Sequence, residues 1–335
     1  MALDRASSRA LGHIMDGGVG ALDHSDVTRI RAIVDRIAEL NGPGPRMVRV
    51  SEHRPTEHRP TGTGSPEGQP RIRLLQPVDE PRGLIISLGM GGWVAGSPDA
   101  EDTVARKLAE RTSCTVALID HRRAPEHRYP AAADDLYTAA RWLWDRRRDL
   151  GHEGLAHMIL GEGMGAALAI VTAARAGADP DGPRFALQLL VCPVTDARAS
   201  GRGSTPGPLF TGDELDRFWD WYLAEPSLRL HPEVSPSMIR DAATLPPTVL
   251  VTAEYDPAGA DGAAFAEQLR ASGTPVAHRH YEGQMHGLLA VVAIPLGERV
   301  FQHLVRAVRG YTARFSDADP PRPAEMGEWL NRIIK

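Results

Sequence analysis

The chain has 335 residues, of which 42% are hydrophobic, and its formal net charge at pH 7 is −5. This composition predicts a globular fold with a large core, and the mild negative charge argues against a general attraction to nucleic acid or to anionic lipid. The start of the chain lacks the continuous apolar region of a signal peptide, and the longest apolar run, "LLAVVAIPL", is too short to span a bilayer. We therefore expect a cytoplasmic protein with no membrane and no nucleic acid among its partners.

Two helices are predicted at the beginning of the chain, over residues 3–15 and 25–40. The segments "MVRVSEHR" and "RIRLLQP" then predict the two strands of a hairpin. Between them a short repeat of "EHRPT" and many turn formers predict a solvated loop.

From residue 83 onward, short buried strands alternate with helical patterns. The predicted strands are 83–88, 114–119, 156–160, 186–192, 247–252 and 275–281, and the predicted helices are 100–111, 133–148, 164–176 and 260–272. This alternation predicts a mostly parallel sheet covered on both faces, with its working groups at the carboxyl ends of the strands.

Two further segments depart from this alternation. Between residues 196 and 245, "TGDELDRFWDWYLAEP" has an apolar stripe at helical spacing behind Thr211. This helix either packs on the sheet domain or forms a cap over a pocket for an apolar ligand. The tail "DADPPRPAEMGEWLNRIIK" has an apolar helical face that could dock on its own domain or on a partner subunit, which leaves a homodimer open.

Four stretches together carry a family resemblance: "ISLGMGGWVAGSPD", "DHRRAPEHRYPAAADDLYTAARWL", "GEGMGAA", and "YDPAGADGAAFAEQLRASGTPV" with "YEGQMHGL". From about residue 70 to 312 the chain resembles the hormone-sensitive lipase family of α/β hydrolases. The resemblance implies an α/β hydrolase fold, a mostly parallel twisted sheet with helices on both faces and a helical cap. We expect a core at 46–200 and 241–315, cap segments at 1–45 and 201–240, and an extension helix at 316–335.

The resemblance also implies the residues of a site. The catalytic acid and histidine of the family fall on Asp256 and His286. The family's GDSAG turn, the nucleophile elbow, falls on residues 161–165 and places Gly163 where the serine usually stands. The HGGG loop falls on residues 89–92. The implied oxyanion donors are the backbone N–H groups of Gly91, Gly92 and Met164.

Glycine has no side chain, so the ordinary acyl-serine mechanism is not available at position 163. A histidine oriented by a carboxylate still acts as a general acid or base near neutral pH. Our leading expectation is a non-hydrolytic enzyme of small-molecule, perhaps natural-product, biosynthesis: a cyclase or dehydratase of the lyase or isomerase type. Two alternatives stay open: a serine-independent esterase in which His286 activates water, and a protein that binds a small molecule without changing it.

The substrate expected at such a site is a small and largely apolar organic molecule. No motif names a cofactor, and neither cysteine, Cys114 or Cys192, has the spacing of a metal site or of a disulfide framework. We therefore expect no cofactor and no metal. The residues expected to line the substrate pocket are Met90, Trp93, Glu162, Phe218, Trp219 and Tyr222.

Overall fold

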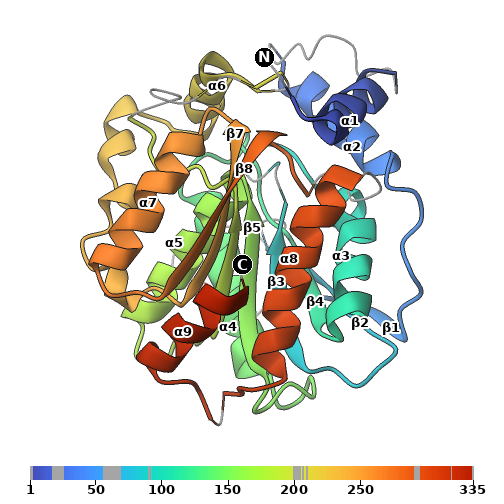
Figure 1. Cartoon of the computed structure of the whole chain (residues 1–335), viewed down its shortest axis with the longest axis vertical. Helices are drawn as coiled ribbons and strands as arrows, with labels where there is room; N and C mark the ends of the chain where they lie inside the picture. The colour runs from blue at the N-terminus through green and yellow to red at the C-terminus, as the bar shows by residue number, and fades with distance from the viewer. Residues whose placement is uncertain are drawn as a thin grey trace.

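The computed structural model describes residues 3–16, 26–55, 69–89, 91, 93–198, 205, 207–208, 210–289, 295–317 and 319–333. A single sheet with the strand order β1-β2-β4-β3-β5-β6-β7-β8 forms the centre of the molecule (Figure 1). Its strands are β1 (Arg49–His53), β2 (Arg71–Gln76), β3 (Gly83–Leu88), β4 (Thr115–Asp120), β5 (Ala156–Glu162), β6 (Leu187–Val191), β7 (Thr248–Tyr255) and β8 (Val276–Met285).

The sheet is antiparallel at one side and parallel through the rest. The pairs β1–β2 and β2–β4 are antiparallel, whereas β4, β3, β5, β6, β7 and β8 pair in parallel. Every residue of β3, β5 and β6 is buried, as expected for strands covered on both faces. The predicted hairpin and the predicted parallel sheet are therefore confirmed.

Helices cover both faces of this sheet (Figure 1). One face carries α3 (Pro98–Thr112) and α8 (Pro295–Thr312), and the other carries α4 (Ala131–Asp145), α5 (Met164–Ala178) and α7 (Gly259–Ala271). The start of α3 follows from its sequence, because Ser97 accepts a hydrogen bond from the Ala100 backbone N–H at 3.1 Å and Pro98 stands in the first turn. This start matters for the site, since the first turn of α3 also carries Glu101.

Three helices gather at the end of the sheet to which the parallel strands point: α1 (Arg5–Asp16), α2 (Val27–Glu39) and α6 (Gly212–Tyr222) (Figure 1). The Thr211 cap of α6 is present as a capping box with Glu214. Short 3-10 helices follow at Pro226–Leu230, Pro236–Met238 and Ala242–Thr244. The division into core and cap segments stays a prediction.

The tail forms α9 (Pro323–Ile333), which docks on its own domain. Trp329 is 1% exposed and packs edge-on against Tyr311 and Phe315, with ring centroids 5.9 and 6.1 Å apart. Of the helices in the described part of the chain, none has the length and hydrophobicity that a bilayer crossing requires.

Candidate active site

A sharp turn joins β5 to α5 at the carboxyl edge of the sheet. Gly163 forms this turn with φ 57° and ψ −120°, a conformation that glycine adopts freely and that strains other residues. The flanking glycines are required by space: a Cβ on Gly161 would lie 2.5 Å from the Ala166 Cα, and one on Gly165 would lie 2.6 Å from the Leu88 carbonyl oxygen. The turn therefore depends on backbone geometry and not on any side chain.

A histidine and a carboxylate meet further along the same sheet edge, at the ends of β7 and β8. His286 follows β8 and Asp256 follows β7, and the His286 Nδ1 lies 2.9 Å from the Asp256 Oδ1. The same Oδ1 accepts the Ala258 backbone N–H at 2.8 Å, while the His286 backbone N–H donates to the Tyr255 carbonyl oxygen at 3.1 Å. With the Asp256 Oδ1 as acceptor, the proton of a neutral imidazole lies on Nδ1, which leaves Nε2 to take a proton.

Opposing effects set the proton affinity of this imidazole. Burial lowers the pKa of His286, but the charge and hydrogen bond of Asp256 and the charge of Glu162 raise it, so that the pKa lies above its ordinary value of 6.5. His286 is 4% exposed, and the Phe210 ring packs against it with centroids 5.1 Å apart. The pair is therefore a somewhat stronger base than free imidazole, held inside the protein.

The loop after β3, which we call the anion loop (residues 89–92), contacts the start of α5 through Gly89. The Gly91 carbonyl oxygen accepts the backbone N–H groups of Val94 and Ala95, both at 3.0 Å. A Cβ on Gly165 would collide with the Gly89 carbonyl oxygen, so this loop and the helix touch through their backbones. Met164 opens α5, where backbone N–H groups have no partner within the helix. Gly92 and Met90 lie outside the described residues.

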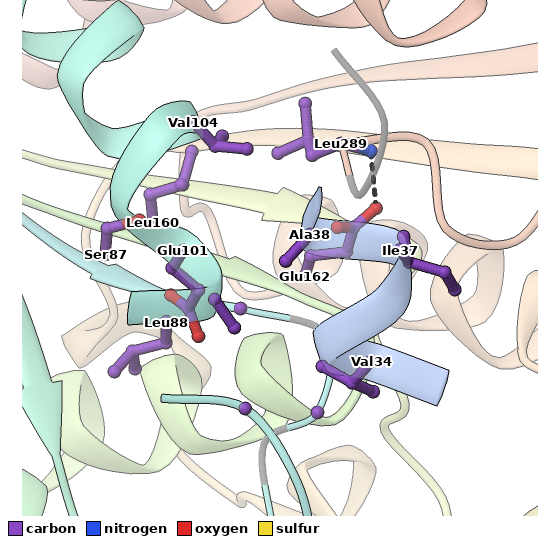
Figure 2. Close-up of a pocket in the computed structure, with 14 residues that line it drawn as sticks. Val34, Ile37, Ala38, Ser87, Leu88, Glu101, Val104, Leu160, Glu162 and Leu289 are labelled. Atoms are coloured by element: carbon purple, nitrogen blue, oxygen red, sulfur yellow. Dashed lines mark hydrogen bonds between the residues drawn. The ribbon is translucent and has the colours of Figure 1, made fainter. Parts of the chain in front are cut away.

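Two acidic side chains face a small cavity beneath the anion loop (Figure 2). Glu162 accepts the Leu289 backbone N–H at 2.8 Å, and burial raises its pKa to about 7. Glu101 accepts the Gly89 backbone N–H, and burial of its carboxyl group raises its pKa to about 8. Sequence reasoning missed Glu101, because an acid in the first turn of a helix is ordinarily a solvated partner of the helix dipole.

This cavity is a small one, with a volume of about 60 Å³. It can hold a few water molecules, since one water needs roughly 10 to 15 Å³, whereas sites for drug-sized ligands measure about 300 to 1,000 Å³. Its walls are the anion loop, the neighbouring strand ends, α3, and the α2 residues Val34, Ile37 and Ala38 (Figure 2). Glu162 thus lines a cavity that has room for a few water molecules and not for a drug-sized ligand.

Most of the aromatic residues expected at the pocket form a closed cluster. Trp93 stacks on Tyr222 with centroids 4.5 Å and planes 7° apart, and its ring lies 4.0 Å from that of Trp219. None of the three is more than 1% exposed. Phe218 instead packs edge-on against Phe210, 5.7 Å away, and so extends the apolar wall beside His286. Sequence reasoning missed Phe210, since it stands alone in a Gly/Pro-rich segment.

A third buried group lies beside the histidine and its acid. The Cys192 Sγ, a carboxylate oxygen of Asp256 and a ring nitrogen of His286 are within 4.8 Å of one another. Cysteine binds metals as the thiolate. Burial, with the charges of Asp256 and Glu162, raises the pKa of Cys192 well above its usual range and so keeps the thiol protonated. The three atoms are close enough together to bind a metal ion, but a protonated thiol does not favour metal binding.

The chain is similar to known proteins whose names record ester hydrolysis. A family model described as alpha/beta hydrolase fold matches residues 85–290. An ethyl acetate hydrolase of Pseudomonas putida is 31% identical over 230 residues, covering 67% of this chain and 72% of that protein. The carboxylesterase NlhH of Mycobacterium tuberculosis is 34% identical over 203 residues, covering 59% of this chain and 63%, under two thirds, of that protein. A solved esterase of Pyrobaculum calidifontis has 28% identity and a TM-score of 0.75, covering 85% of this chain and 93% of that one.

These similarities correct the leading expectation from the sequence. A cyclase or dehydratase of the lyase or isomerase type, acting in biosynthesis, is wrong, because the similar proteins are named as ester hydrolases. The expectation rested on the glycine at position 163 together with the retained Asp256 and His286. The hydrolytic alternative agrees better with the named relatives.

Proposed function

The chain belongs to the α/β hydrolase fold family, and from this premise we propose that it hydrolyses esters of small carboxylic acids with His286 as the general base. The observation that carries the proposal is the buried contact of 2.9 Å between the His286 Nδ1 and the Asp256 Oδ1, at the same sheet edge as the turn at Gly163. The ester-hydrolase names of the relatives support the reaction class.

In this proposal Gly163 stands at the position of the family's nucleophilic serine. Its φ of 57° and ψ of −120° support that assignment, because the family's serine sits on a sharp, strained strand-to-helix turn. No hydroxyl is present there to form an acyl-enzyme. The attacking group is therefore a water molecule that gives a proton to the His286 Nε2.

The reaction then needs two further steps. The backbone N–H groups of Gly91 and Met164 stabilise the negative oxygen that forms when water adds to the ester carbonyl. The protonated His286 returns its proton to the departing alkoxide, which releases the alcohol and the acid. Asp256 holds the ring in position and stabilises its charged form. The substrate class, a small ester with apolar groups, is supported by the Phe210 ring beside His286 and by the Phe218 ring that packs on Phe210.

Hydrolysis of 4-nitrophenyl acetate tests this proposal. We expect slow turnover by the wild-type protein, because removing the nucleophile from a triad leaves on the order of 10³ to 10⁴ in rate over water. His286→Ala should lower this turnover about a hundredfold or more, because the general base is lost, and the exposed His127→Ala should leave it unchanged. Intact-mass measurements during turnover should detect no acetylated protein.

Two results would reject the proposal. Turnover in His286→Ala equal to that of the wild type would remove the general base from the mechanism. Tight capture of the ester without any product would instead indicate a protein that only binds small molecules.

A further inference from the structure

The anion loop carries no side chain at Gly89, and a carboxyl group from another element fills the space beside it. A Cβ built on Gly89 would collide with the Glu101 Oε1 and would lie 3.0 Å from the Glu101 Cγ. The three atoms nearest to such a Cβ all belong to Glu101. Gly89 does not have a positive φ, so its backbone could accept another residue if this carboxyl group were elsewhere.

The same carboxyl group also binds the loop backbone. Glu101 accepts the Gly89 N–H, while the Gly89 carbonyl oxygen lies against Gly165 on the other side. Gly89 is thus held between the first turn of α3 and the first turn of α5. Without Glu101 the Gly89 N–H would lose this acceptor, and the space beside Gly89 that the carboxyl group fills would open.

The geometry points to Glu101 as the residue that positions the anion loop. In the family that this chain resembles, the loop begins with a histidine at the place of Gly89. Here the space beside Gly89 is filled by the Glu101 side chain, which comes from the first turn of α3. In this role Glu101 is a positioning residue that acts through the backbone of Gly89. The inference rests on the proposed function in so far as this loop stabilises an oxyanion.

The proposed role predicts which substitutions the site tolerates. Glu101→Gln keeps an acceptor oxygen of the same reach, whereas Glu101→Ala removes it and opens the space beside Gly89. Burial raises the pKa of Glu101 to about 8, so near neutral pH the uncharged amide is a close mimic of the native acid. Glu110→Gln, an exposed acid on the same helix, is the matched control.

Hydrogen exchange tests the positioning without any need for activity. In Glu101→Ala, peptides that contain Gly89 should exchange about tenfold faster or more, while β6 peptides should not change. Glu101→Gln and Glu110→Gln should exchange like the wild type. Unchanged exchange at Gly89 in Glu101→Ala, or an equal increase throughout the protein, would overturn the inference.

Ester turnover, measured in the wild type and in a Gly163→Ser background, gives a second test. We expect Glu101→Ala to lower kcat about ten- to a hundredfold with little change in KM, and Glu101→Gln to restore most of it. Gly89→Ala should also lower kcat, because its methyl group displaces the carboxyl group. Adding Glu101→Ala to Gly89→Ala should then cause far less than the sum of the two losses.

Additive losses in the double variant, or a change confined to KM, would count against a positioning role. If no variant hydrolyses an ester, the proposed function fails, and hydrogen exchange still decides the inference about Glu101.

Discussion

The two halves of the site use different chemical groups: backbone N–H groups in one and side chains in the other. At the turn around Gly163 and at the anion loop, the function is expected of backbone N–H groups, and close-packed glycines fix their positions. At the ends of β7 and β8, it is expected of two side chains, His286 and Asp256, joined at 2.9 Å. The comparison teaches that the first, or backbone, half needs no side chain at position 163 to keep its geometry, whereas the second, or side-chain, half depends on two side chains.

The largest expected effect comes from giving the backbone half a nucleophile. Gly163→Ser should raise the hydrolysis of 4-nitrophenyl acetate about a thousandfold or more, because a serine there would meet the base and the oxyanion donors in place. The strained conformation should lower the free energy of unfolding by about 1 to 3 kcal/mol.

Gly163→Ala is the matched control for this gain, since it adds the strain without the hydroxyl group. It should be as destabilised as Gly163→Ser in urea unfolding and no more active than the wild type. Equal activity in the two variants would show that the backbone half no longer fits a serine mechanism.

The next effect comes from weakening the side-chain half. Asp256→Asn should lower kcat/KM by at least about a hundredfold, since the amide neither stabilises the imidazolium nor enforces the tautomer. The raised pKa of His286 predicts that kcat/KM falls as the pH drops through a midpoint above 6.5. In Asp256→Asn that midpoint should move to lower pH, whereas the exposed Asp241→Asn should leave it in place.

The smallest effect concerns Glu162, which links the two halves through Leu289. Burial raises the pKa of Glu162 from 4.5 to about 7, so the folded state holds a proton that the unfolded state releases. Its contribution to stability is therefore complete below pH 4.5 and is lost as the pH rises toward 7. Glu162→Gln should remove up to about 3 kcal/mol of this pH dependence from urea unfolding measured between pH 4.5 and 7.5. A slope identical to that of the wild type would indicate that Glu162 is ionised throughout.

Much of the fold could be predicted because its signals are local. Continuous apolar runs such as that of β3 identify buried parallel strands, and Thr211 with Glu214 identifies the start of α6. The elbow and the pairing of Asp256 with His286 followed from the resemblance, which ties motifs to strand ends.

The remainder depends on contacts between distant segments. Nothing near Glu101 in the sequence indicates that its carboxyl group reaches Gly89, and the aromatic spacing of α6 does not distinguish a pocket wall from the closed packing of Trp93, Trp219 and Tyr222. The reaction class was misjudged for a related reason. The absent hydroxyl at position 163 was taken to disfavour the reaction class that the names of the similar proteins record.

The contact between Gly89 and Gly165 has a mechanical consequence. Because the Gly89 carbonyl oxygen packs against the backbone of Gly165, with no side chain between them, a shift of the anion loop at Gly89 would push on the first turn of α5. Thermal motion should therefore displace both segments together, as one rigid block. A protein engineer who wished to separate the two segments would have to shift the backbone of the helix, because no side chain between them can be trimmed.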